Sequence, residues 1–228
     1  MKMETIVEAT EMETIVEARR SRADWTSLSV AELDHAEWAR ARPVRLTRYW
    51  SGESAPFARQ AEARLLWDAG ALYARFVCEQ REPLIANASP QREWKTMGLW
   101  DRDVCELFVA PHVGDLRRYY EFEVAPTGEW LDLAVRMTAE GRETDWGFYS
   151  GMTAAARINS DSVTVAMRVP WDAFAGVKAP RTGERWRVNL FRCIGADPTR
   201  GYLAWQPTLA PEPNFHVPEK FGWLLFSD

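Results

Sequence analysis

The chain has 228 residues, of which 46% are hydrophobic, and this suits one sizeable all-β domain with a real core. Its formal net charge of −5 argues against a nucleic-acid or anionic-membrane partner, because phosphate binding requires clustered Lys and Arg. Twelve Trp residues are far above normal usage, and indoles serve either as core filler or as flat stacking faces. The three Cys residues form no CxxC pair, so a structural zinc site is not expected.

The N-terminal segment 1–22 is expected to be a charged tail, disordered or loosely helical, in front of a single domain at 23–228. Within it METIVEA occurs at 3–9 and again at 12–18, which is too short to be a solenoid repeat. The segment lacks the apolar core of a signal peptide, and no apolar run approaches the length of a transmembrane helix. Taken by itself, the sequence therefore predicts a cytoplasmic chain.

Alternating segments separated by turn signals predict about ten short strands and almost no helix. The clearest hairpin spans 64–79 around an Asp-Ala-Gly turn, and two more span 119–136 and 152–169. In the segment 31–46 we expect a short strand, a turn and a second strand, with Trp38 directed inward. The pattern predicts an all-β fold, a single antiparallel β-sandwich of jelly-roll type.

The C-terminal half continues this pattern. PWDAF at 170–174 fits one helical turn that begins at a proline. Strands are expected at 185–194, at 201–205 and at 221–226. The segment 207–218 contains four prolines, so it is expected to be a stiff loop.

The stretch 99–111, LWDRDVCELFVAP, holds the first candidate site. Its strand alternates so that Glu106 shares one face with two large apolar residues, where a carboxylate is rare unless it is paired or hydrogen-bonded. Trp100 precedes the strand, and it is either an exposed platform for a sugar ring or a cap on the core edge.

Two further carboxylates stand on the next predicted strand. Glu121 and Glu123 are two residues apart and point to one face, so pairing of the two strands would bring them together with Glu106. Three carboxylates could accept hydrogen bonds from sugar hydroxyls, bind calcium or act as a glycosidase acid and base. Alternatively, nearby arginines could neutralise them in a structural network; the candidates are Arg117, Arg118, Arg136 and Arg192.

The proline-stiffened loop presents Asn214, Phe215 and His216. A stiff loop holds an aromatic ring and an amide at low entropic cost, as a preformed binding site requires. Phe215 could equally be a plug that folds into the core. Trp205 and Gln206, which precede this loop, are expected to pack beneath it. Nucleophilic catalysis has little support, because the chain contains no GxSxG elbow and no recognisable triad.

Three segments together, at 99–111, 169–192 and 205–226, resemble carbohydrate-binding module family 9. The resemblance implies a β-sandwich in which two aromatic side chains enclose a terminal sugar. Carried over by position, Trp100 is one wall, Glu106 is a polar ligand, and Phe215 is the second wall, where the family usually has Trp. Asn214 lies in the same loop.

The chain departs from the family at Glu121 and Glu123, where sugar-binding members have Arg and Asn. Because ionised carboxylates only accept hydrogen bonds, the resemblance implies either a different sugar or loss of sugar binding. It also implies a secreted protein and leaves a structural calcium ion open. The wider superfamily includes haem-binding domains, but no Met and His spacing here picks out an axial pair.

We therefore predict a non-catalytic carbohydrate-binding domain with no catalytic residue and no cofactor. Its partner is a mono- or oligosaccharide. The expected ligand-binding residues are Trp100, Glu106, Glu121, Glu123, Asn214 and Phe215. The alternatives are a glycoside hydrolase that uses paired carboxylates, a haem-binding sandwich, and a structural module in which Trp100 and Phe215 are buried.

Overall fold

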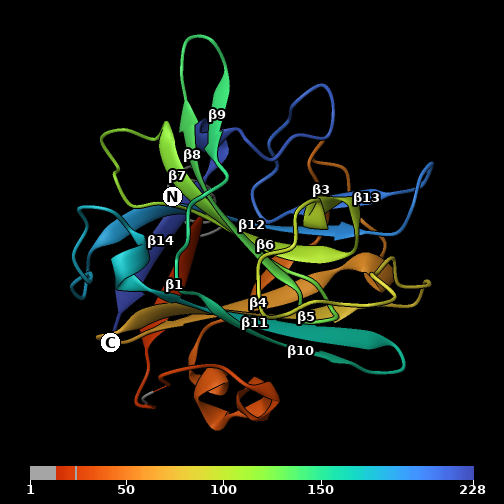
Figure 1. The fold of residues 1–228 in the computed structure, drawn as a ribbon, viewed down its shortest axis with the longest axis horizontal. Coiled ribbons are helices and arrows are strands. Elements are labelled where there is room, and N and C mark those ends of the chain that lie inside the picture. The colour runs from red at the N-terminus through yellow and green to blue at the C-terminus, as the bar shows by residue number, and fades with distance from the viewer. Residues whose placement is uncertain (1–13, 24) are drawn as a thin grey trace, which may run out of the picture.

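The computed structural model describes residues 14–23 and 25–228, which form mostly β-strands (Figure 1). Within these residues there are fourteen strands, namely β1 (Ile15–Arg20), β2 (Val44–Leu46), β3 (Arg48–Tyr49), β4 (Ala61–Trp67), β5 (Ala71–Glu79), β6 (Val104–Ala110), β7 (Arg118–Val124), β8 (Trp130–Met137), β9 (Arg142–Asp145), β10 (Thr153–Ile158), β11 (Ser162–Pro170), β12 (Arg185–Ile194), β13 (Gly201–Ala204) and β14 (Gly222–Ser227). The helical elements there are 3₁₀ helices, namely η1 (Val30–Asp34), η2 (Ala36–Arg40), η3 (Phe57–Arg59), η4 (Leu99–Asp101), η5 (Trp171–Ala173) and η6 (Pro218–Lys220).

The strands form one curled sheet with the order β10-β11-β5-β4-β1-β14-β12-β6-β7-β8-β9. Figure 1 shows β4, β5, β11 and β10 in the lower half and β12, β6, β7 and β8 crossing above them. The two halves face each other, since Cys78 Sγ on β5 lies 3.4 Å from Cys105 Sγ on β6. The core between them includes Leu107, Phe122 and Val165, which are fully buried. The predicted all-β sandwich is confirmed.

For Ile15–Arg20, the strand β1 corrects the expectation of a disordered or loosely helical tail over 1–22. It lies between β4 and β14 and pairs with both in parallel, whereas the other strand pairs are antiparallel. Val16 and Ala18 point into the core and are fully buried, while their neighbours in the strand are partly exposed. Burial of these alternate apolar side chains stabilises residues 15–18 of the second METIVEA copy as part of a strand. The first copy, at 3–9, lies outside the described residues.

The three predicted hairpins are confirmed as β4–β5, β7–β8 and β10–β11, each antiparallel. The Asp68 carboxylate holds the first turn by accepting from the backbone N–H groups of Gly70 and Ala71, at 2.7 and 2.9 Å. The expected strand at 185–194 is β12, and PWDAF contains the single 3₁₀ turn η5. Turn chemistry and period-2 alternation therefore predicted most of the sheet.

The expected strand and turn over 31–37 are wrong, because η1 and η2 occupy this segment. Ser29 and Glu32 form a capping box on η1, and the His35 ring accepts from the N–H of Glu37 at the start of η2. Trp38 is directed inward as predicted and is 2% exposed. The two helices cover the outer face of the β4–β5–β11 half, where Trp38 packs in a cluster with Tyr73.

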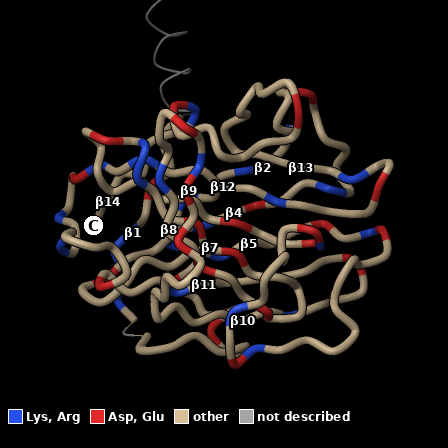
Figure 2. The backbone as a smooth tube through the Cα atoms, turned by 45° about the horizontal axis from the view of Figure 1, so that its top comes forward, with Lys and Arg blue, Asp and Glu red and all other residues tan. Residues whose placement is uncertain are grey.

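The opposite outer face belongs to β12, β6, β7 and β8, and it carries its own apolar cluster around Phe108, Leu133 and Phe191. Loops cover this cluster and leave an opening that is described below. Figure 2 shows acidic and basic residues interspersed along strands and loops around the molecule. Among the described residues, no helix has the length and apolar character needed to cross a bilayer.

Candidate functional site

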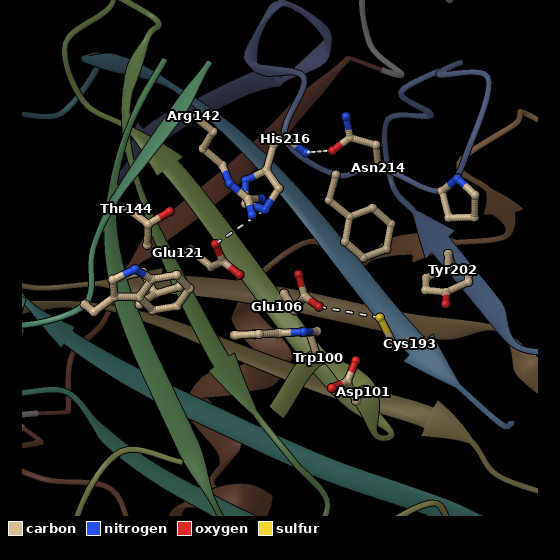
Figure 3. Close-up of a pocket in the computed structure, with 14 residues that line it drawn as sticks. Trp100, Asp101, Glu106, Glu121, Arg142, Thr144, Cys193, Tyr202, Asn214 and His216 are labelled. Carbon is tan, nitrogen blue, oxygen red and sulfur yellow. Dashed lines mark hydrogen bonds and ion pairs between the residues drawn. The ribbon is translucent and has the colours of Figure 1, made fainter. Parts of the chain in front are cut away.

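A pocket of about 250 Å³ opens on the outer face of the sheet half that contains β6 and β7 (Figure 3). Its walls come from η4, from strands β6 to β9 and β12 to β13, and from the loop before η6. The lining residues are Trp100, Asp101, Glu106, Glu121, Leu133, Arg142, Thr144, Trp146, Cys193, Tyr202, Pro213, Asn214, Phe215 and His216. The fold therefore brings two segments of this set together, around Trp100 and around Phe215, from distant parts of the chain.

Strand register brings the three predicted carboxylates onto one face. Glu106 on β6 is directly opposite Glu123 on β7, and Phe108 is opposite Glu121. Directly opposite residues of antiparallel strands point to the same side, as do residues two apart within a strand. The predicted convergence of Glu106, Glu121 and Glu123 is therefore observed.

Only two of these carboxylates reach the pocket. Glu106 and Glu121 line it, with 2% and 4% of their surface exposed, whereas Glu123 is fully buried and is not part of its wall. The helix η4 packs against β7, and its Asp101 is among the charges that act on Glu123. Glu123 therefore lies behind the floor that the other two carboxylates form.

These carboxylates have few partners among the described residues. Cys193 Sγ donates to Glu106 Oε1 at 3.5 Å, and His216 Nε2 lies 3.9 Å from Glu121 Oε2. Glu121 Oε2 and both oxygens of Glu123 are buried and accept no hydrogen bond from a nitrogen or hydroxyl donor of the described residues, and the Glu121 and Glu123 carboxyl groups lie close enough to hydrogen-bond to each other when one is protonated. The floor of the pocket is therefore short of donors.

The predicted arginine network does not form here. Arg192 is buried, but it donates to the carbonyl oxygens of Arg59, Gln60 and Glu79 and to the side chain of Gln80. Arg117 pairs with Asp115 on the surface at 3.0 Å. Across the described part of the chain, no Lys or Arg side chain is within ion-pair distance of Glu106, Glu121 or Glu123.

Burial changes the protonation of this face. Removal from water raises the pKa of Glu106 well above its ordinary value, and the charge of Glu121 adds to this effect. Burial also raises the pKa of Glu121, and it raises that of Glu123 well above normal with help from Glu106. Burial and the charge of Arg142 lower the pKa of His216 to about 3, so its ring is neutral at pH 7.

His216 is held in place by two contacts. Its Nδ1 lies 2.8 Å from the Tyr119 hydroxyl, and its backbone N–H donates to Asn214 Oδ1 at 2.9 Å. Figure 3 shows the ring turned toward Glu121, with Arg142 and Thr144 of β9 beside it. A stiff loop end and a core tyrosine therefore fix this side of the pocket.

The aromatic walls differ in how they are supported. Trp100 is half-buried in η4, and its ring centroid lies 6.1 Å from that of Trp146, with the planes at 46°. Phe215 is 8% exposed and stacks on Phe191 with centroids 4.0 Å apart and planes at 11°. Phe215 therefore combines the two roles that the sequence left open, since it is a core plug and also part of the wall.

Several lining residues were missed by the sequence analysis. Arg142 and Thr144 lie on β9, a short and mostly exposed strand without hydrophobic alternation. Trp146 follows it and is 48% exposed, and an exposed indole after a polar segment was the one available signal. Cys193 lies in a continuously buried part of β12, and it is the direct register partner of Tyr202 on β13. The pairing of these two strands, which the sequence does not indicate, places both side chains on the pocket face.

The remaining sequence candidates lie elsewhere. Trp205 is partly buried against the central core, as expected of a packing residue, and with Gln206 it borders a separate groove beside β2. No group of three His, Cys, Asp or Glu side chains is arranged to hold a metal ion within residues 14–23 and 25–228.

A pocket that joins aromatic rings to carboxylates, an amide and a guanidinium has the composition of a small-molecule binding site. The family model described as carbohydrate-binding family 9 matches residues 49–226. This match covers most of the chain, so the chain belongs to carbohydrate-binding family 9. The resemblance read from three segments of the sequence is confirmed.

Solved structures share this fold. A candidate carbohydrate-binding protein from Bacteroides uniformis aligns over 94% of this chain and 99% of its own, with a TM-score of 0.74 and 20% identity. A family 9 module from Caldicellulosiruptor kristjanssonii in complex with cellotriose covers 93% of both chains, with a TM-score of 0.61 and 16% identity. The glucose complex of a family 9 module from this organism covers 93% of this chain and 95% of its own, with a TM-score of 0.60 and 15% identity. No curated protein matches the chain.

Proposed function

We propose that the chain binds a mono- or oligosaccharide without chemical change, and that one sugar ring occupies the pocket beside Trp100. The observation that carries the proposal is the meeting of four aromatic side chains, those of Trp100, Trp146, Tyr202 and Phe215, with three carboxyl side chains in one pocket of about 250 Å³. Small-molecule sites usually measure roughly 300–1,000 Å³, so this pocket suits a single ring better than a long chain segment. The glucose and cellotriose complexes of the fold neighbours support a sugar as the ligand.

The indole of Trp100 would hold the apolar face of the ring. It is half-buried and approaches the pocket from η4, which begins after Gly98 in the left-handed conformation with φ of 71°. Stacking contacts with an aromatic face use dispersion and do not require charge. Phe215 would form the second wall, held rigid by its stack on Phe191. A wall that is already packed loses little entropy when the ligand binds.

Polar groups around the ring would orient its hydroxyls. Glu106 and Glu121 supply acceptors at the floor, and a protonated carboxyl can also donate. Asn214 and Arg142 line the rim and supply N–H donors. Sugar-binding members of the family have Arg and Asn where β7 of this chain has Glu121 and Glu123. Arg142 therefore offers a cation from β9 instead. Glu123 would support the floor without touching the sugar.

The arrangement of the carboxylates favours binding over hydrolysis. A glycosidase places its two carboxyl groups on opposite sides of the bond that is cleaved. Glu106, Glu121 and Glu123 share one face of two adjacent strands and form one wall. We therefore propose that the chain is not an enzyme.

The test is calorimetric titration of the full chain with a panel of mono- and oligosaccharides. Saturable heat with at least one sugar is the expected result. An absence of heat across the panel would overturn the proposal. Parallel incubation with chromogenic aryl glycosides tests the non-catalytic assignment, since steady release of the aryl group would show hydrolysis.

A further inference from the structure

The charge around the pocket is unbalanced. Asp101, Glu106 and Glu121 contribute acidic groups, and Arg142 is the one Lys or Arg side chain among the lining residues. His216 adds no charge at pH 7, since its pKa is about 3. Glu123 stands directly behind the floor, opposite Glu106. A ligand in this pocket therefore meets a mostly acidic surface.

The acidic floor also contains a buried carboxyl group that no cation of the protein pairs with. Glu121 is 4% exposed and lines the pocket, and its Oε2 accepts no hydrogen bond from a nitrogen or hydroxyl donor of the described residues, while its side-chain neighbour is the carboxyl group of Glu123. The nearest basic nitrogen, His216 Nε2, is 3.9 Å away, beyond hydrogen-bond distance. Taking a carboxylate out of water without a partner is costly, and a cation in contact with it offsets that cost. The protein itself places no such cation at this oxygen.

From this geometry we infer that the pocket selects a sugar that carries a primary ammonium group, that is, an amino sugar, with the ammonium placed on the Glu106–Glu121 floor. This inference rests on the proposed function, because it names the class of sugar that the same pocket takes. An ammonium has three donors and no acceptor, so it complements a floor that offers acceptors. Burial favours the neutral forms of Glu106 and Glu121 in the empty pocket, and the charge of a bound ammonium favours their ionised forms. Hydrogen bonds between two charged groups are about twice as strong as neutral ones.

The rest of the pocket is compatible with this orientation. With the ammonium on the floor, the apolar face of the ring can lie against Trp100, which Figure 3 shows beside Glu106. The ring hydroxyls then face Asn214 and Arg142 at the rim. An amide and a guanidinium can hydrogen-bond hydroxyls, so the same groups that bind a neutral sugar remain in use.

The test compares four sugars of one stereochemical series on the unaltered full chain at about pH 7, by calorimetric titration. Glucosamine is cationic there, glucose and N-acetylglucosamine are neutral, and glucuronate is anionic. We expect glucosamine to bind about tenfold more tightly than glucose, since a charged hydrogen bond replaces a neutral one. Glucuronate is expected to bind most weakly, because the floor repels its carboxylate.

A matched pair of variants ties the preference to the floor. Glu121→Gln removes the charge and keeps the shape, so the affinity ratio of glucosamine to glucose should fall to about one. Glu143→Gln makes the same charge change on an exposed residue of β9 outside this pocket, and the ratio should remain about tenfold.

The outcomes separate the inference from the function on which it rests. If glucose binds as tightly as glucosamine, or if glucuronate binds best, the inference is wrong and the sugar-binding function stands. If none of a wider sugar panel produces heat, the proposed function itself fails. Because the four-sugar comparison uses the unaltered chain, its result does not depend on the folding of a variant.

Discussion

Glu106 on β6 and Glu123 on β7 are direct register partners in the sheet, and both are buried on the same face. Side chains in such a pair have Cβ atoms about 4.5–5.5 Å apart, and like charges at this distance repel. No described Lys or Arg pairs with either residue. The pair is therefore most stable when it carries fewer than two negative charges, which makes folding sensitive to pH.

The pH dependence follows from the raised pKa of Glu123. Above the ordinary glutamate pKa of about 4.3, the folded chain binds more protons than the unfolded chain, so stability falls as pH rises. Glu123→Gln removes this contribution and should increase the free energy of unfolding by roughly 1–3 kcal/mol at neutral pH. Urea unfolding of both proteins between about pH 4 and 8 measures the difference. Glu143→Gln, on an exposed residue, serves as the control and should leave the slope unchanged.

Trp100→Ala should reduce sugar affinity by roughly thirtyfold or more, because it removes a stacking face from the pocket. The free energy of unfolding should fall by roughly 1–2 kcal/mol, since Trp100 is partly exposed and packs at the edge of the cluster around Phe108. Trp94→Ala is the matched control, because Trp94 is 65% exposed and lies outside the pocket. Equal affinities in the two variants, measured by calorimetry, would remove Trp100 from the binding site.

Phe215→Ala should behave differently from Trp100→Ala. Phe215 is stacked on Phe191 and nearly buried, so truncation leaves a cavity as well as an open wall. We expect a loss of about 3 kcal/mol of stability together with weaker sugar binding. Thermal unfolding and calorimetric titration of one sample measure both effects. Unchanged stability would show that the ring does not serve as a core plug.

Val16→Asp should destabilise the whole domain, because Val16 is fully buried in β1 between the two halves of the sheet. A carboxylate without a partner in this position should cost several kcal/mol or prevent folding. Glu17→Ala, at the next and partly exposed position, should change stability by about 0.5 kcal/mol. Soluble expression and urea unfolding distinguish the two. A stable Val16→Asp protein would mean that β1 is dispensable.

Much of the sheet could be predicted from alternation and turn residues. The face of β6 that carries Glu106 was predicted correctly, because period 2 fixes which side chains share a face. The segment that contains β1 was not recognised, because its charged residues alternate with few apolar ones and its partners lie at distant positions in the chain. Ser29 and Glu32 fit the capping-box pattern, which predicts a helix start. The sequence analysis instead predicted a strand for this segment.

Part of the candidate site could be predicted from the sequence, and the rest depends on tertiary packing. Five of the six predicted residues line one pocket, since their positions follow from a strand face and a stiff loop. The full burial of Glu123 could not be predicted, because it depends on tertiary packing around β7, which includes η4. Arg142 and Trp146 reach the pocket through β9, whose sequence has no apolar pattern to mark it. Tertiary contacts between polar segments leave no periodic signal.

Sugar binding beside Trp100 can be observed directly in an experimental structure of the full chain with bound sugar. We expect a sugar ring stacked on Trp100, with a carboxylate oxygen of Glu106 or Glu121 within hydrogen-bond distance of the ligand. A sugar seated elsewhere, such as the groove bordered by Trp205, or an empty pocket at saturating sugar, would contradict the proposed site.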